Sequence, residues 1–261
     1  MCYNLKYLTE KKIKYARLFG ISDEEIRELE KELELVNFDE KAKYFVTGFE
    51  HPSIPVFTKD EKLKLNFFFW GLIPFWVKDF EEAKKIRNQT INARSESLFQ
   101  KPAFRNPAKT NRCVIPADAF YEYHHYNNNA YPYHIFLKSG DPMLIAGIFD
   151  NWTFIETGEM YQTVAIVTTK ANALMQKIHN NPKTKEPRMP VILDKENAMK
   201  WLNNNIMHNH HDLLKELYVP YNENKMDAYT VAKFKNKEEN RNSPETTKEF
   251  HYPELNSVTL L

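Results

Sequence analysis

The apolar residues of this 261-residue chain occur in short runs that turn-forming residues interrupt. The longest run, 67–76, contains Gly71 and Pro74 and falls short of the ~20 residues that a membrane-spanning helix needs. Hydrophobic residues make up 42% of the chain and no heptad repeat continues along it, which excludes wholesale disorder and a coiled coil. Three shorter runs are apolar or β-branched, as buried strands usually are: 67–72, 144–149 and 164–169.

Helices are expected at three places along the chain. Ser22 has the spacing of a capping box to a following glutamate, and the apolar residues after it lie on one face of a helix over 23–35. A short helix is expected over 171–178, and Asp194 can cap another that runs through Leu202. Strands and helices alternate irregularly, which favours an α+β fold over a doubly wound parallel sheet.

The last part of the chain differs in composition from the rest. Residues 236–261 are polar and charged, contain Pro244 and Pro253, and offer few apolar anchors. We therefore expect one domain over residues 1–235, followed by a loosely ordered tail.

Charge is distributed unevenly, although the formal net charge is only +1. Residues 84–113 carry eight basic side chains and a single acid, Glu96. Such a segment can hold the phosphates of a nucleic acid without recognising its sequence. A solvated surface is the usual explanation of a charge run, but this imbalance exceeds what interspersed surface pairs produce.

The two cysteines, Cys2 and Cys113, are too few for a disulfide framework or a four-cysteine zinc site. No signal peptide precedes them, so we expect a cytoplasmic protein in a reducing compartment. Cys113 stands beside Val114 and Ile115 and is most simply a small buried hydrophobic residue.

Cys2 carries an unusual combination of groups if Met1 is removed, because one residue then bears a free α-amine and a thiol. An α-amine has a pKa of about 7.7–8.0, so part of it is neutral and nucleophilic at cellular pH. An aldehyde can form an imine with this amine and then close onto the sulfur as a thiazolidine. The same residue can act as an N-terminal nucleophile in amide hydrolysis. Taken alone, a cysteine beside the start methionine is more simply an accident of position.

Six further motifs follow Cys2 in order along the chain. They are WGLIPFW at 70–76, NARSE at 92–96, CVIPADAFYEY at 113–123, AGIF at 146–149, TT at 168–169, and His179 ahead of RMPVIL at 188–193. Together with Cys2 they resemble the SRAP family, the SOS response-associated peptidases that process abasic sites. The resemblance covers residues 1–235 and depends on several separate motifs in the right order.

The resemblance implies an α+β single domain with a mixed, barrel-like β core and peripheral helices. It implies that Cys2, freed of Met1, bonds covalently to the ring-opened aldehyde of an abasic site in single-stranded DNA, in the response to DNA damage. It also implies a thiol autopeptidase that removes what precedes the cysteine, although a methionine aminopeptidase can substitute here. It implies no metal, organic cofactor, membrane or obligate protein partner, and we expect a monomer.

Three further residues match the family's catalytic positions. Asn92 offers a neutral amide that can orient the α-amine without adding charge. Glu122 stands among aromatic residues, where desolvation raises the pKa of a carboxyl toward the range useful for proton transfer. His179 can carry protons during imine formation, because an imidazole titrates near neutrality. On spacing alone, a turn residue, a solvent-facing strand residue and a helix-end histidine explain the three at least as simply.

Six residues are candidates for contact with DNA. Four are bases that can hold phosphates and two are tryptophans that can stack on nucleobases: Arg94, Lys101, Arg105, Arg188, Trp70 and Trp76. Core packing is an equal explanation of the tryptophans, and we expect Trp70 to be buried.

The sequence departs from the family pattern at two places. Tyr3 and Asn4 follow the cysteine where the family usually has Gly and Arg, so one expected phosphate contact is missing. Residues 180–187 are inserted between His179 and the RMP motif. Because this insertion contains prolines, we expect a loop that bulges and leaves His179 in place.

Other histidines provide less specific signals. His124 and His125 are the substitutes if His179 is displaced. The remaining cluster, His208, His210 and His211, lacks a nearby carboxylate pattern and favours a polar surface over a metal site.

The leading hypothesis is therefore an abasic-site processing protein that acts through Cys2. One alternative is a peptidase or amidase that cleaves other proteins with Cys2 as nucleophile. Another is a non-catalytic single-strand binding module in which Cys2 is incidental.

Overall fold

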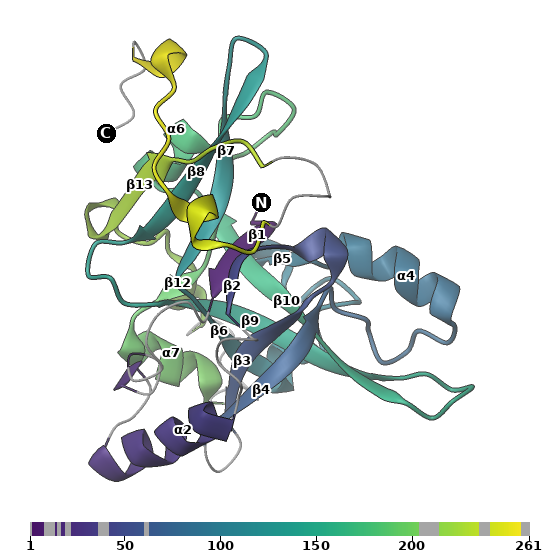
Figure 1. Ribbon diagram of the computed structural model, residues 1–261. Coiled ribbons are helices and arrows are strands. Elements are labelled where there is room, and N and C mark those ends of the chain that lie inside the picture. The colour runs from purple at the N-terminus through teal and green to yellow at the C-terminus, as the bar shows by residue number, and fades with distance from the viewer. Residues whose placement is uncertain are drawn as a thin grey trace.

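Five strands pair in a closed ring and form a small β-barrel (Figure 1). The computed structural model describes residues 2–7, 14, 17–18, 22–35, 42–59, 63–203, 214–234 and 241–256. The ring runs from β3 (Ser53–Lys59) to β4 (Leu63–Trp70), β10 (Met160–Lys170), β9 (Met143–Thr153), β6 (Arg112–Ala117) and back to β3. The pairs are antiparallel except for β4 with β10. The three predicted strands fall on β4, β9 and β10, which confirms them.

Three short strands extend the barrel wall. β5 (Asn92–Arg94) and β11 (Arg188–Pro190) pair with β10, and β12 (Ile192–Leu193) pairs with β9. Cys113 is fully buried on β6, as expected of a small hydrophobic residue.

A second sheet of five strands holds the start of the chain. Its order is β13 (Met226–Thr230), β8 (Asn129–Leu137), β7 (Ala119–Tyr126), β1 (Asn4–Tyr7) and β2 (Lys43–Thr47). β7 and β8 form a hairpin whose turn residues, Asn127 and Asn128, have φ of 47° and 60°. Asparagine tolerates this left-handed conformation, which matches the twist of a two-residue hairpin. β1 lies between β2 and β7, so the N-terminal segment is an interior part of the sheet.

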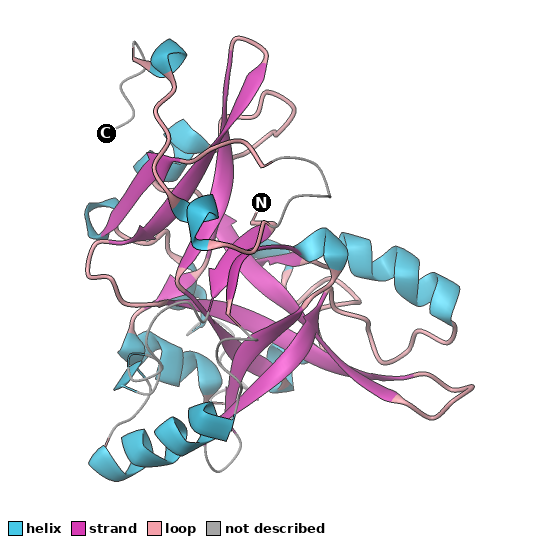
Figure 2. Cartoon of the chain, in the orientation of Figure 1, coloured by secondary structure: helices cyan, strands magenta, loops and turns pink. Residues whose placement is uncertain are grey.

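The helices lie around the two sheets (Figure 2). They are α2 (Asp23–Leu35), α4 (Phe80–Gln89), α5 (Pro107–Thr110), α6 (Ala173–Ile178) and α7 (Lys195–Leu202). The predicted capping box is confirmed, since the Ser22 and Glu25 side chains each accept from the other residue's backbone N–H. Asp194 caps α7 by accepting from the Asn197 N–H at 2.8 Å, also as predicted.

The C-terminal segment differs from the expected loose tail over residues 241–256. Glu249 forms a β-bridge with Val231, and the Tyr252 hydroxyl donates to the Val231 carbonyl at 2.9 Å. The Tyr252 ring also packs against Tyr131, with centroids 4.9 Å apart. Aromatic anchors therefore hold this segment against the second sheet despite its polar composition. The predicted boundary at residue 235 and the final residues, 257–261, lie outside the described part of the chain.

The predicted α+β class with a barrel-like core and peripheral helices is confirmed. Among the helices that the structure describes, none combines the length and the apolar character that crossing a membrane requires.

Candidate active site

Strand pairing brings Cys2 to Glu122. β1 pairs with β7 so that Leu5 lies opposite Phe120 and Asn4 lies opposite Tyr121. Antiparallel pairing runs the two strands in opposite directions, so the residues just before Asn4 meet the residues just after Tyr121. Residues 120 places apart in the sequence are thus neighbours in space.

The Cys2 thiol is fully buried and uncharged. Its residue is 0% exposed, and its sulfur lies 4.0 Å from the Asn4 carbonyl oxygen. Burial, reinforced by the Glu122 carboxylate, raises the pKa of this thiol well above its usual range. The sulfur is therefore a thiol and not a thiolate at neutral pH.

Glu122 is buried in the same place, with 7% of its surface exposed. Burial raises the pKa of its carboxyl to about 7, because the charged form loses its hydration. Near neutral pH the group is present in both protonation states, which suits it to accepting and returning a proton.

His179 faces Glu122 from the end of α6. Its Nδ1 lies 3.7 Å from Glu122 Oε1 and 3.0 Å from the Arg188 carbonyl oxygen. Burial lowers the pKa of this imidazole to about 4, so the ring is neutral at pH 7. The Glu122–His179 contact is therefore not an ion pair, and 3.7 Å is too long for a direct hydrogen bond.

Hydrogen bonds around α6 hold His179 in position. Asn172 caps the helix by accepting from the Met175 N–H. Asn180 forms two hydrogen bonds with the His125 backbone, of 2.6 and 3.0 Å. Residues 180–187 form the loop expected from the sequence and leave His179 beside Glu122.

The two substitute histidines, His124 and His125, lie on β7 and differ in their surroundings. His124 is buried and its Nδ1 lies 2.8 Å from the Lys177 carbonyl oxygen, so it ties β7 to α6. His125 borders the same cleft as His179.

Asn92 is a buried amide whose nitrogen and oxygen both lack a hydrogen-bond partner among the described residues. It is 9% exposed and lies on β5, opposite Ile166 of β10. A buried amide left unpaired costs free energy that a bound group can recover. Asn92 is thus available to a ligand rather than engaged in the fold.

An open cleft of about 280 Å³ is lined by Glu122 and His179. Its lining residues are Tyr3, Arg94, Glu122, Tyr123, His125, His179, Asn181, Thr184, Glu186 and Arg188. The inserted loop supplies three of them, Asn181, Thr184 and Glu186. Sequence reasoning missed their place at the cleft, because an insertion has no family pattern to compare with.

The predicted DNA-contacting residues fall into two groups by exposure. Arg94, Lys101 and Arg105 are exposed, and Trp76 is 41% exposed. Only Arg94 of these four lines the cleft. Their roles stay predictions.

Trp70 is a core residue, so the interpretation of it as a DNA contact is wrong. It is fully buried and its indole N–H donates to the Ile91 carbonyl at 3.0 Å. The ring therefore has no face for a nucleobase, and the core interpretation of Trp70 holds.

Two arginines of the basic motifs are engaged by the protein itself. Arg188 is 1% exposed and pairs with Glu96 at 2.8 Å and with Glu186 at 3.3 Å. Arg112 is also 1% exposed and donates to four backbone carbonyls, including that of Trp201. Arg188 borders the cleft, but a phosphate that binds there would have to compete with the carboxylates of Glu96 and Glu186.

No group of metal-ligating side chains occurs within the described ranges. The histidine cluster His208, His210 and His211 lies outside the described residues.

The chain is similar to proteins of one family. A family model described as "SOS response associated peptidase (SRAP)" matches residues 1–237. The abasic site processing protein YoqW of Bacillus subtilis is 43% identical over 177 residues, which are 67% of this chain and 72% of that protein. The abasic site processing protein HMCES of Gallus gallus is 32% identical over 153 residues, 51% of this chain and 43% of that protein.

Solved structures show the same fold. A crystal structure of a protein from Bacteroides thetaiotaomicron superimposes with a TM-score of 0.77 at 33% identity, covering 96% of this chain and 100% of the other. A second, from Bordetella bronchiseptica, has a TM-score of 0.69 at 21% identity, covering 88% of this chain and 100% of the other.

Proposed function

The chain belongs to the SRAP family, and from that premise we propose that it captures abasic sites in single-stranded DNA as a covalent thiazolidine at Cys2. The observation that carries the proposal is that strand pairing sets the buried Cys2 beside Glu122, which faces His179 and lines a cleft with it. Its relatives are named abasic site processing proteins, and the ring-opened form of an abasic site presents an aldehyde.

The first requirement is removal of Met1, because the nitrogen of Cys2 is otherwise a peptide nitrogen. One route uses the protein's own thiol. The Cys2 sulfur attacks the Met1 carbonyl and its proton passes to Glu122. The carbon–nitrogen bond to Cys2 then breaks as Glu122 returns that proton to the leaving nitrogen, which frees the α-amine and leaves Met1 as a thioester on the sulfur. Water hydrolyses the thioester, which releases methionine and restores the thiol. A methionine aminopeptidase reaches the same product. In either case this cleavage frees the α-amine of Cys2 and so matures the protein.

The amine of Cys2 then attacks first, because the buried thiol is not ionised. Addition to the aldehyde carbon gives a carbinolamine, and loss of water gives an imine. The thiol adds to the imine carbon and its proton passes to the nitrogen, so the net change is one water released. Glu122, poised near neutrality, and the neutral imidazole of His179 transfer the protons.

Asn92 and Arg94 have supporting roles in this proposal. The unpaired amide of Asn92 can accept a hydrogen bond from the new amine and so orient its lone pair. Arg94 is exposed at the cleft and can hold a phosphate of the strand. No step requires a metal or an organic cofactor.

The test is to incubate the mature protein with single-stranded DNA that carries one abasic site and to run a denaturing gel. We expect a covalent band that is absent for Cys2→Ala and retained for Cys113→Ala, the matched control at the other buried cysteine. An unchanged band for Cys2→Ala would refute the proposal. Steady turnover of a peptide substrate would favour a peptidase, and salt-sensitive binding without a covalent band would favour a binding module.

A further inference from the structure

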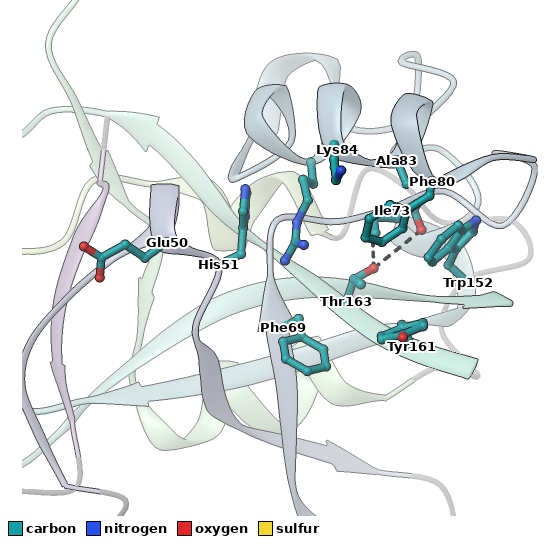
Figure 3. A pocket seen from close by; sticks show the side chains of 11 residues that line it. Glu50, His51, Phe69, Ile73, Phe80, Ala83, Lys84, Trp152, Tyr161 and Thr163 are labelled. Atoms are coloured by element: carbon teal, nitrogen blue, oxygen red, sulfur yellow. Dashed lines mark hydrogen bonds between the residues drawn. The ribbon is translucent and has the colours of Figure 1, made fainter. Parts of the chain in front are cut away.

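A second pocket, of about 190 Å³, lies beside helix α4. Four of its eleven lining residues are Phe, Trp or Tyr, and Figure 3 shows Phe69 and Tyr161 on the strand side, with Phe80 and Lys84 on the helix side. Phe69 is 40% exposed and Phe80 is 44% exposed. Large aromatic faces open to water are costly unless something covers them.

The pocket walls are held in place by specific contacts. The Thr163 hydroxyl accepts from the Ile73 N–H at 2.8 Å (Figure 3), and the Trp152 indole donates to the Val77 carbonyl at 2.7 Å. Gly71 has a φ of 112°, and a Cβ there would lie 2.6 Å from His51 Nδ1. Only glycine allows this backbone conformation and this approach. The pocket is therefore part of the fold and not a packing defect.

Arg87 gives the pocket a positive charge. Its Nε is buried without a hydrogen-bond partner, and the guanidinium forms no ion pair within the described part of the chain. Lys84, in contrast, already pairs with Glu81 at 2.8 Å and lies over the Phe80 ring at 4.5 Å. The pocket thus combines aromatic surfaces with one available hydrogen-bond donor group.

The pocket adjoins the cleft at Glu122 and His179 through a single turn of chain, η1 (Gly48–Glu50). Tyr3 lines the cleft, and its ring lies 4.8 Å from that of Phe49. The next two residues, Glu50 and His51, line the pocket. A strand that crosses the cleft can therefore place a neighbouring nucleotide in the pocket.

We propose that this pocket binds an unpaired nucleobase of the same DNA strand, close to the abasic position. A nucleobase is flat and uncharged, so aromatic walls can stack on it and the carboxylate of Glu50 does not repel it. The oxygen and nitrogen acceptors on its edge match the donors of Arg87. This inference rests on the proposed function. It adds a second place, besides the reacting residue, at which the protein binds the strand.

The test uses single-stranded oligonucleotides with a tetrahydrofuran abasic analogue, which has no aldehyde and so binds without covalent reaction. The fluorescent base 2-aminopurine is placed in turn at each position beside the analogue. We expect its fluorescence to be quenched at one position, and we expect Phe69→Ala to abolish that quenching and weaken Kd about 10-fold. Ile155→Ala, an exposed apolar residue outside the pocket lining, should leave both within about 2-fold of the parent.

A change in the DNA gives a second measurement that needs no altered protein. Removing the base at the quenched position should weaken binding by the same factor, and it should add nothing to Phe69→Ala, because both changes delete one contact. Equal quenching at every position, or additive losses, would overturn the inference. The covalent reaction at Cys2 with a true abasic site is scored separately, so the proposed function can stand or fall on its own.

Discussion

The cleft at Glu122 and His179 and the pocket beside α4 lie on either side of one short turn, yet they have opposite chemistry. The cleft gathers groups whose pKa values burial shifts, Glu122 upward and His179 downward. The pocket gathers aromatic rings around a single unpaired donor group, that of Arg87. Shifted pKa values suit proton transfer, whereas aromatic faces suit recognition. The contrast assigns reaction to one region and strand binding to the other.

The largest expected effect comes from Glu122→Gln. Loss of a positioned proton carrier should slow crosslink formation about 100-fold at saturating DNA and leave Kd for the tetrahydrofuran oligonucleotide unchanged. Glu186→Gln is the matched control, because Glu186 lines the same cleft but is paired with Arg188 and half exposed. A loss of affinity with an unchanged rate would reverse the assignment of the two regions.

The pKa shifts of Glu122 and His179 should make opposite contributions to the pH dependence of the free energy of unfolding. The folded pKa of Glu122 is about 7, above its ordinary 4.5, so folding binds a proton and stability falls as pH rises between these values. The folded pKa of His179 is about 4, below its ordinary 6.5, so stability rises over that interval. The two slopes offset each other in the parent protein.

Single substitutions should separate these slopes in urea unfolding measured from pH 4.5 to 6.5. Glu122→Gln should become more stable by up to about 3 kcal/mol as pH rises, whereas His179→Gln should become less stable. Parallel pH curves for the parent and both variants would show that the cleft residues are not desolvated as described.

The crosslinking rate should depend on pH through Glu122. If the carboxylate accepts a proton in the slow step, Glu122 adds a step near pH 7 to the one that protonation of the Cys2 α-amine causes at about 7.7–8.0, and the step near 7 disappears in Glu122→Gln. The neutral imidazole of His179 adds no further step between pH 5 and 6.5, because its pKa is about 4. A step near 6.5 that survives in Glu122→Gln would transfer the main proton-carrying role to His179.

The smallest effect concerns the phosphates. Arg94→Gln should reduce the log–log dependence of DNA affinity on salt by about 0.7, the contribution of one neutralised phosphate on a single strand. Lys200→Gln, an exposed base on α7 outside the basic segment, should leave that slope unchanged. Equal slopes for both variants would remove Arg94 from the strand's path.

The sequence was informative where local chemistry decides structure. The capping box at Ser22 and the Asp194 cap formed as predicted, because a cap depends on a few adjacent residues. Three of the barrel strands, β4, β9 and β10, followed from their apolar composition. Motif order also singled out His179, and α6 and Asn180 hold this residue beside Glu122 despite the inserted loop, although its catalytic role stays a prediction.

Long-range pairing could not be predicted in the same way. Nothing local in residues 4–7 shows that β1 enters the middle of a sheet, yet this pairing alone brings Cys2 to Glu122. Charge in the sequence also does not reveal exposure. Arg112 and Arg105 belong to the same basic segment, but the first is buried on backbone carbonyls and the second is exposed.

The most direct test of the account is to map both groups of Cys2 in the covalent product. The adduct is denatured and treated with iodoacetamide and an amine acylating reagent. It is then digested, and the mass of its N-terminal fragment is measured by mass spectrometry. The account predicts an N-terminal fragment that lacks Met1 and is heavier by the DNA remnant less one water. Neither reagent modifies Cys2 in this fragment, whereas the separate peptide that contains Cys113 is alkylated. An alkylated Cys2, an attachment at a lysine, or a retained Met1 would contradict it.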